Sequence, residues 1–345
     1  MRRGCHFVIP GDWHTPTGGY RYDRRIALAL RESEWQVDLC TLGDSFPWPD
    51  AATLAQAQSQ IDALPDGALV VADGLAFGAM PELAQRHAKR LRWVALVHHP
   101  LHIETGLADP AREALRASEC EALQAASRVI VTSEATARDL APMGVPSERI
   151  RVVEPGTDRV QANRASTNGT VRLLCVATLT SRKGHAVLLQ ALAGLPALDW
   201  ALHCVGSAQR DPSTSDHLRR VTFELGLGDR VHWHGELDEA SLSAHYAAAD
   251  LFVLPSFHEG YGMVVTESLA HGLPVVCTTG GALAQTLPRT AGLHVPPGDV
   301  SALREALAVL IGQPVERARF AAVARAAAEQ LPTWPQAATR FAAVL

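Results

Sequence analysis

The chain has 345 residues, of which 47% are hydrophobic and 19% are charged, and its formal net charge is −5 at pH 7. This length exceeds what one hydrophobic core usually serves, so we expect two domains, and the composition excludes a disordered, fibrous or repeat protein. The small negative charge argues against a dedicated nucleic-acid-binding protein.

The first ten residues, MRRGCHFVIP, place two arginines before an apolar stretch that is too short for the core of a signal peptide. We interpret this stretch as a first buried strand. No apolar run in the chain approaches the roughly 18 residues that a membrane span requires, and no amphipathic segment supports membrane association. The six cysteines show no CxxC spacing, which is typical of reduced thiols. We therefore expect a cytoplasmic protein.

The first half of the chain repeats one pattern, in which a short apolar run is followed by a turn and by a stretch of helical periodicity. Continuous rather than alternating apolar runs are typical of strands covered on both faces, and hence of a parallel sheet between helices. Repeated units of this kind predict a doubly wound α/β domain. The runs that we expect to be strands are 5–9, 36–42, 68–72, 92–97, 128–132 and 151–153.

A polar segment then interrupts the pattern. It runs from Glu154 to Asp158 and from Gln161 to Thr170, and we interpret it as a linker between domains. A second series of apolar runs follows, each except the last with a helical stretch behind it. Its expected strands are 171–177, 200–205, 230–234, 251–255, 274–278 and 292–295.

The pattern therefore predicts two similar doubly wound parallel-sheet domains, residues 1–158 and residues 159–332. The remaining segment, 333–345, begins with Thr333-Trp334-Pro335 and continues as an amphipathic helix. We expect this helix to pack back on the first domain.

Two glycines, Gly18 and Gly19, stand where the first predicted helix begins. A ligand-binding loop and a structural tight turn explain them equally well. The loop does not contain GxGxxG, so a nicotinamide site is not indicated. The first helical turns are candidates for contact with a phosphorylated acceptor, and they contain Arg21, Tyr22, Arg24 and Arg25.

Three histidines, His98, His99 and His102, follow the predicted strand 92–97. Histidines this close together invite a metal-site interpretation. However, no neighbouring residues in the sequence complete a ligand set, and a chain with 15 histidines produces such clusters readily. We therefore expect no metal here.

Arg182 and Lys183 follow the predicted strand 171–177, and Lys183 is one of only two lysines in the chain. The carboxyl end of a strand faces the crevice in which doubly wound domains bind ligands. Cationic groups there would stabilise a departing diphosphate as its charge develops. A solvated turn is the alternative for this tripeptide taken alone.

The most informative segment, SFHEGYGMVVTESLAHG, lies between the predicted strands 251–255 and 274–278. A glycine loop followed by a helix from near Gly262 offers unpaired N–H groups and a helix dipole, which favour a phosphate. Glu259 and Glu267 suit the hydroxyls of a sugar or ribose diol better than a phosphate. Two solvated charges would be the alternative for an isolated pair, but the glycines and the strand position favour ligand binding.

The spacing Glu259-x7-Glu267 within HEGYGMVVTES resembles the E-x7-E signature of glycosyltransferase family 4. The resemblance implies a GT-B fold, with two Rossmann-like domains facing a cleft, a UDP- or GDP-sugar donor, and α-glycosides formed with retention. It also implies that Glu259 holds hydroxyls of the donor hexose and that Glu267 holds the ribose diol. The backbone amides implied to face the sugar and the diphosphate are those of Gly260, Tyr261, Gly262 and Met263.

The same resemblance gives roles to other segments. Lys183 is implied to contact the pyrophosphate, with Arg182 beside it, although Thr178 or a neighbour stands where the family usually has an arginine. In the first domain, His98 matches a histidine close to the reacting sugar, and His99 is the competing assignment.

Three further segments are compared with the family. Gly18 and Gly19 resemble the glycine loop whose amides approach the donor. Residues His232 to His234 end a strand where the nucleobase commonly lies. Thr279-Gly280-Gly281 either lines the site or forms a turn.

The chain has no Asp-x-Asp sequence, so the resemblance implies metal-independent chemistry without a cofactor. Retention by front-face attack needs no enzyme nucleophile, and double displacement through a carboxylate remains open. The acceptor hydroxyl, on a glycan, a lipid or a small molecule, is not decided. A nucleotide-sugar epimerase and a non-catalytic sugar-binding protein are alternatives. The residues expected to act in catalysis are His98, Arg182, Lys183 and Glu259.

Overall fold

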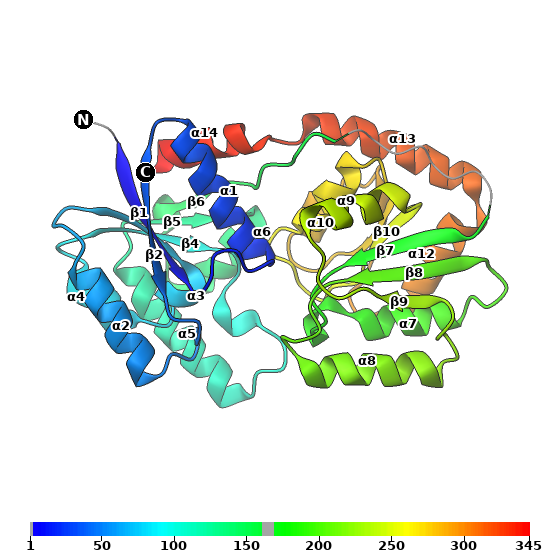
Figure 1. Ribbon diagram of the computed structural model, residues 1–345, viewed down its shortest axis with the longest axis horizontal. Coiled ribbons are helices and arrows are strands. Elements are labelled where there is room, and N and C mark those ends of the chain that lie inside the picture. Colours follow the sequence, from blue (N-terminus) through cyan, green and yellow to red (C-terminus); the bar gives the residue numbers. More distant parts are fainter. Residues whose placement is uncertain (1–2, 161–168) are drawn as a thin grey trace. The chain divides into compact units, whose positions relative to one another are not determined.

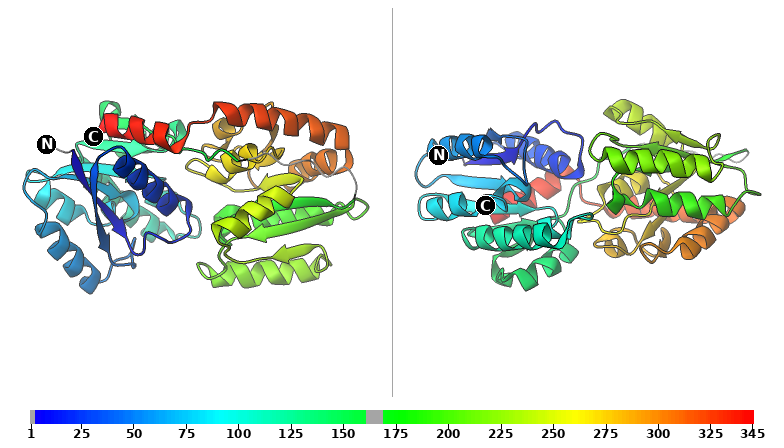
Figure 2. Two further views of the ribbon diagram at one scale, coloured as in Figure 1. Left: turned by 45° about the horizontal axis from the view of Figure 1, so that its top comes forward. Right: turned by 90° about the horizontal axis from the view of Figure 1, so that it is seen from below.

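The computed structural model describes residues 3–160 and 169–345. These residues form two compact units, the first containing Met1–Gly156 and Pro332–Leu345 and the second containing Thr157–Leu331. Both units are α/β structures with helices on the two faces of a sheet (Figures 1 and 2). Of the predicted linker, only its beginning, 154–158, and residues 169–170 belong to the described part of the chain.

The first unit is built on a six-stranded parallel sheet with the strand order β2-β1-β3-β4-β5-β6. All six predicted strands are confirmed, and their ends differ from the expected ones by at most one residue. Every residue of β3 is buried, as expected for a strand covered on both faces. The strands are β1 (Gly4–Pro10), β2 (Gln36–Leu42), β3 (Leu69–Asp73), β4 (Arg92–Val97), β5 (Arg128–Val131) and β6 (Ile150–Val152).

The helices of the first unit alternate with its strands. They are α1 (Gly18–Glu32), α2 (Ala51–Asp62), α3 (Gly74–Phe77), α4 (Pro81–His87), α5 (Asp109–Gln124), α6 (Glu134–Leu140) and α14 (Trp334–Val344). Three short 3₁₀ helices, η1 (Leu101–Ile103), η2 (Ala141–Met143) and η3 (Ser147–Arg149), complete the unit.

The last helix, α14, packs beside α1 (Figure 1). A capping box begins it, in which Thr333 and Gln336 satisfy each other's backbone N–H groups. Phe341 is fully buried and stacks on Phe7 of β1, with ring centroids 6.0 Å apart. The apolar face of this amphipathic helix is therefore part of the first unit's interior.

The second unit repeats the architecture, with the strand order β12-β11-β10-β7-β8-β9 and parallel pairing throughout. Its six predicted strands are also confirmed to within one residue at each end. They are β7 (Val171–Val176), β8 (Trp200–Val205), β9 (Val231–Trp233), β10 (Leu251–Leu254), β11 (Val275–Thr278) and β12 (Gly292–Val295).

The helices of the second unit depart from the prediction at one place. We expected no helix after the run 292–295, but α12 and α13 both follow β12, and their leucine, alanine and phenylalanine side chains join the core. The helices are α7 (His185–Ala193), α8 (Pro212–Glu224), α9 (Glu239–Ala248), α10 (Met263–Ala270), α11 (Leu283–Thr286), α12 (Val300–Gly312) and α13 (Pro314–Gln330), with the 3₁₀ helix η4 (Ser181–Lys183).

The strand order fixes where each unit can bind a ligand. In the second unit β7 and β10 are neighbours although they are far apart in the sequence, and in the first unit β1 and β3 are neighbours in the same way. At such a reversal of strand order the connections leave in opposite directions, and a crevice opens beyond the carboxyl ends of the strands. Among the helices of residues 3–160 and 169–345, none combines the length and apolar character needed to cross a membrane.

Candidate functional site

In the second unit, the loops after β7 and β10 lie against each other at the reversal of strand order. Gly184 adopts φ +69°, and a Cβ atom on it would lie 2.2 Å from the carbonyl oxygen of Pro255. Phe257 also donates its backbone N–H to the carbonyl oxygen of Arg182 at 2.8 Å. These contacts bring Arg182 and Lys183 to the loop that carries Glu259.

Glu259 is the centre of a compact charged group. Its Oε1 accepts hydrogen bonds from Lys183 Nζ and from the hydroxyl of Ser256, both at 2.6 Å. An Arg182 guanidinium nitrogen lies 3.7 Å from Oε2 and donates to the carbonyl oxygen of His258 at 2.8 Å. Glu259 is only 7% exposed, so its interpretation as a solvated loop charge is wrong.

The carboxyl group of Glu259 is ionised at neutral pH. Burial by itself raises the pKa of this carboxyl, because it removes the charge from water. The positive charges of Lys183 and Arg182 and the hydrogen bonds from Lys183 and Ser256 more than offset burial, and they lower the pKa to about 2. At neutral pH the group therefore contains two cations and one carboxylate.

The helix α10 begins directly after this charged group. Gly262, its N-cap, adopts φ 91° and ψ 51°, and no side chain caps the helix there. The start of α10 is consequently a candidate anion-binding terminus. Gly280 and Gly281 close the loop from the β11 side, since Ala282 donates its N–H to the carbonyl oxygen of Glu259 at 2.8 Å.

Glu267 lies inside α10 and is half-buried. Its Oε2 accepts a hydrogen bond from the hydroxyl of Tyr246 at 3.1 Å. Tyr246 is itself buried and stacks on the ring of His271, with centroids 4.8 Å apart. Glu267 is therefore held in place by a tyrosine from α9 that the sequence analysis did not identify.

In the first unit, the structure brings Gly19 and His98 together. A Cβ atom on Gly19 would lie 3.0 Å from Cδ2 of His98, so a larger residue at this position would crowd the ring. Gly18 begins the same helix, at the carboxyl end of β1. His99 instead lies 3.4 Å from Glu104. Of the two histidines, His98 is thus the one beside the glycine loop.

His98 has two carboxylate partners that the sequence analysis missed. Its Nε2 lies 3.0 Å from Asp23 of α1 and 3.4 Å from Asp73 at the end of β3. Both carboxylates are buried. No sequence neighbour of His98 suggested these partners, but the three residues place one ligand atom each within 4.8 Å of one another. Asp73 ends a strand that neighbours β4, and this was the available signal.

The two carboxylates keep His98 positively charged. Burial disfavours the charged imidazole, but the charges and hydrogen bonds of Asp23 and Asp73 outweigh it and raise the pKa of His98 from 6.5 to about 10. A raised pKa means that the charged form contributes stability fully below pH 6.5, and that this contribution is lost as the pH rises through about 10. His98 is an imidazolium at neutral pH.

We expect the NMR signals of the His98 ring to show no deprotonation between pH 6 and pH 9. In Asp23→Asn the pKa of His98 should fall by about 1–3, because one of its two charged partners is removed. In the control Asp38→Asn, which alters a carboxylate 3.9 Å from the half-buried ring of His6, the His98 titration should not change. A His98 signal that titrates near pH 6.5 in the wild type would contradict the charge assigned to the cluster.

In the first turns of α1, Tyr22, Arg24 and Arg25 contact other residues of the first unit. Tyr22 is buried and donates its hydroxyl to the carbonyl oxygen of Val153 at 2.9 Å, so its role is structural. Arg24 donates to the carbonyl oxygen of Trp13 at 2.9 Å. Arg25 lies over the ring of Trp334, 5.0 Å from its centroid.

Comparison with known proteins places these observations in a family. Residues 68–161 match the family described as "Glycosyltransferase Family 4", and residues 170–313 match the family described as "Glycosyl transferases group 1". The second match contains Arg182, Lys183, Glu259 and Glu267, which are the charged residues of the site in the second unit.

Curated relatives support the same grouping. A D-inositol 3-phosphate glycosyltransferase of Xylanimonas cellulosilytica is 30% identical over 238 residues, which are 64% of this chain and 57% of the relative. A GDP-mannose-dependent phosphatidylinositol monomannoside mannosyltransferase of Corynebacterium glutamicum is 29% identical over 59% of this chain and 55% of the relative. The matches thus span less than two thirds of these relatives' lengths.

Solved structures share the fold over nearly the whole chain. A sucrose-phosphate synthase from Thermosynechococcus elongatus superposes with a TM-score of 0.82 at 23% identity, covering 99% of this chain and 98% of that one. Anabaena HepE in complex with UDP and glucose superposes with a TM-score of 0.80 at 20% identity, covering 98% of each chain. The expected GT-B fold, two doubly wound parallel sheets, is confirmed.

Proposed function

The chain belongs to glycosyltransferase family 4, and from this premise we propose that it transfers a hexose from a UDP- or GDP-sugar to a hydroxyl of an acceptor, with retention of configuration. The observation that carries the proposal is the contact of Lys183 with Glu259, next to the uncapped start of α10. It places cations, a carboxylate and a helix start without a side-chain cap together at the reversal of strand order. A nucleotide sugar offers an anion and hydroxyl groups to match them.

We propose that the diphosphate binds at the start of α10, against the amides of Gly260 to Met263. The ammonium of Lys183 and the guanidinium of Arg182 then face the oxygens that gain charge as the bond to the sugar breaks. These groups are present as cations without any metal ion, and we propose that the reaction uses none and needs no cofactor.

We propose that the two glutamates bind hydroxyl groups of the nucleotide sugar. An ionised carboxylate can accept about four hydrogen bonds, so Glu259 keeps capacity for hexose hydroxyls beyond its bonds from Lys183 and Ser256. Glu267, oriented by the hydroxyl of Tyr246, is proposed to accept from the ribose diol. Because Tyr246 comes from a different helix, the orientation of Glu267 does not depend on the loop.

In the first unit, we propose that His98 and the amides of Gly18 and Gly19 contact the donor sugar. As an imidazolium, His98 can only donate hydrogen bonds and cannot act as a base. We therefore propose that it stabilises negative charge or a sugar hydroxyl, and that attack occurs from the front face without an enzyme nucleophile.

All six cysteines are free thiols, which supports a cytoplasmic location.

Two relatives name phosphorylated or lipid-linked acceptors, an inositol phosphate and a phosphatidylinositol monomannoside. For this chain we propose only an acceptor hydroxyl, without its class. An epimerase of the same fold is the second candidate, because it would share the phosphate contacts, although not the E-x7-E spacing of Glu259 and Glu267. The two differ in product, since an epimerase changes the nucleotide sugar in the absence of any acceptor.

The proposal is tested by thermal unfolding of the wild type with UDP-, GDP-, ADP- and TDP-sugars. A donor at 100 times its dissociation constant should stabilise the protein by about 2.7 kcal/mol. In Glu267→Gln, which keeps the shape of the side chain but removes its charge, the shift with the preferred donor should shrink or vanish. The control Glu305→Gln alters an exposed glutamate on α12 and should leave the shift unchanged.

No shift with any of the four donors would contradict a nucleotide-sugar site. An equal shift in wild type and Glu267→Gln would contradict the ribose role of Glu267 only. Incubation of the preferred donor with the protein alone, followed by chromatography, separates the candidates, because only an epimerase would convert the donor to an isomeric sugar nucleotide.

A further inference from the structure

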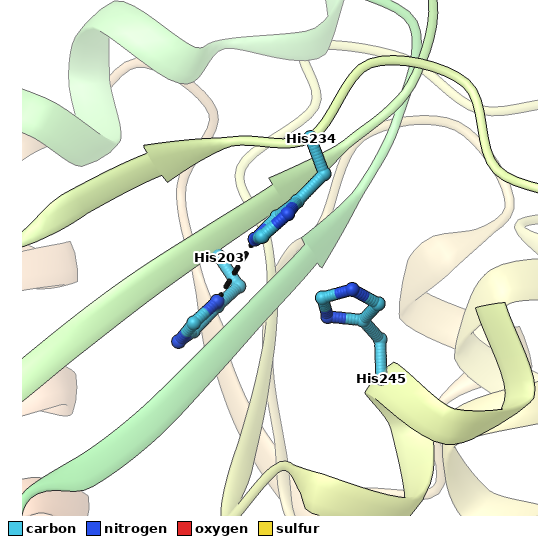
Figure 3. Close-up of side chains that lie close together, drawn as sticks. All are labelled: His203, His234 and His245. Atoms are coloured by element: carbon cyan, nitrogen blue, oxygen red, sulfur yellow. Dashed lines mark hydrogen bonds between the residues drawn. The ribbon is translucent and has the colours of Figure 1, made fainter. Parts of the chain in front are cut away.

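Four histidines gather on one face of the sheet in the second unit. His203 lies in β8 and is paired in register with His232 in β9. His234 follows two residues later and projects to the same face, because side chains alternate along a strand. His245 comes from α9, which covers this face (Figure 3).

Three of these imidazoles are in direct contact. His203 Nδ1 and His234 Nε2 are 2.9 Å apart, and their rings are stacked with centroids separated by 5.2 Å. The centroid of the His245 ring is 4.4 Å from that of His234 and 5.9 Å from that of His203. Figure 3 shows the three rings converging from β8, from the segment after β9 and from α9.

The spacing of the nitrogens suits one metal ion. Each of the three histidines offers a ring nitrogen within 4.8 Å of the other two. Zinc–nitrogen bonds of about 2.0–2.1 Å in a tetrahedral arrangement place ligand nitrogens about 3.3 Å apart. Side-chain rotations alone therefore bring the three nitrogens to metal-binding distances.

The surroundings distinguish this group from a salt-bridged cluster. Within residues 3–160 and 169–345, no carboxylate forms an ion pair with His203, His234 or His245. His203 and His245 line a hollow of about 320 Å³, and His234 is exposed. A metal ion could thus reach the three rings and keep a fourth position for water or for the neighbouring His232.

We propose that His203, His234 and His245 bind a divalent transition-metal ion, with zinc as the best match. Imidazole nitrogens are preferred ligands of zinc, and a set of three with an open fourth position is an established zinc arrangement. Such an ion would link β8 and the segment after β9, which are already paired in the sheet, to the helix α9.

The test uses tag-free full-length protein stripped with EDTA and titrated with ZnCl₂ against a chromogenic zinc indicator. We expect one tight equivalent, a rise in melting temperature, and visible d–d absorption of four-coordinate cobalt when CoCl₂ replaces zinc. His245→Gln and His234→Gln should each weaken zinc binding by at least about tenfold. The control His217→Ala removes an exposed histidine of α8 and should bind zinc as the wild type does.

A further variant sharpens the assignment. Arg172 lines the same hollow, so Arg172→Gln removes a positive charge close to the ion and should strengthen zinc binding. The metal-free melting temperatures of all variants are compared first, and His234→Gln, at an exposed position, is expected to fold normally. The proposal is overturned if the wild type binds no zinc, or if His234→Gln and His217→Ala lower zinc affinity equally.

Discussion

Replacing Lys183 by methionine is expected to lower kcat/KM by about 10²–10³-fold, which is typical of removing one preorganised group that stabilises transition-state charge. In the wild type the ammonium lies 2.6 Å from Glu259 and beside the start of α10, where the proposed leaving diphosphate gains charge. Methionine fills a similar volume without the charge. Arg182 remains nearby, 3.7 Å from Glu259, and accounts for the residual rate.

The chain supplies a matched control for this substitution. Lys89 is the only other lysine and lies exposed in the first unit, so Lys89→Met should leave kcat/KM unchanged. Glucosyl or mannosyl transfer to a surrogate acceptor, or donor hydrolysis, is measured at several donor concentrations. Loss in kcat greater than the rise in KM would identify an interaction made mainly in the transition state. A decrease smaller than tenfold would remove Lys183 from the proposed mechanism.

Gly184→Ala is expected to destabilise the second unit by at least about 3 kcal/mol, because it adds a clash to backbone strain. Gly184 adopts φ +69°, and its new Cβ would lie 2.2 Å from the carbonyl oxygen of Pro255. That oxygen belongs to the main chain just after β10 and cannot move without displacing the loop of Glu259. The substitution should therefore also separate Lys183 from Glu259.

Gly226→Ala isolates the strain from the clash. Gly226 adopts nearly the same angle, φ +68°, but nothing lies within 4 Å of the position that its Cβ would take. We expect a cost of only about 1–2 kcal/mol for this variant, from the left-handed backbone alone. Chemical denaturation of both variants gives the comparison. If Gly184→Ala and Gly226→Ala were equally destabilising, the loops that follow β7 and β10 would not pack as closely as the structure shows.

Much of the fold could be predicted from local pattern. Continuous apolar runs such as 251–255 and 92–97 must be buried on both faces, and this alone predicts parallel strands between helices. The same reasoning placed Lys183 and Glu259 at the carboxyl ends of two strands. The helices after β12 were missed for different reasons. In α12 the buried residues Leu303, Leu307 and Leu310 do recur at helical spacing, so the signal was present and was overlooked. The alanine-rich α13 carries little apolar periodicity.

Most of the residues that contact the site residues could not be predicted from the sequence. Asp23 and Asp73 meet His98 only because α1 begins beside the end of β4 and β3 is the neighbour of β4. The hydroxyl of Tyr246 donates to Glu267, although Tyr246 lies on another helix and precedes Glu267 by 21 residues in the sequence. No pattern in the sequence connects residues at such separations, since contact between them depends on strand order and on which face each helix covers.

The sequence by itself determined the two α/β domains, their strands and the types of side chain at the strand ends, because burial and backbone hydrogen bonding act on short segments. Only the tertiary structure decided which of those side chains meet. It made Glu259 a buried ion-paired carboxylate, it made His98 an imidazolium between two aspartates, and it assembled three histidines from β8, the segment after β9 and α9. Charge and metal affinity follow from those contacts, which exist only once the strands are ordered in a sheet.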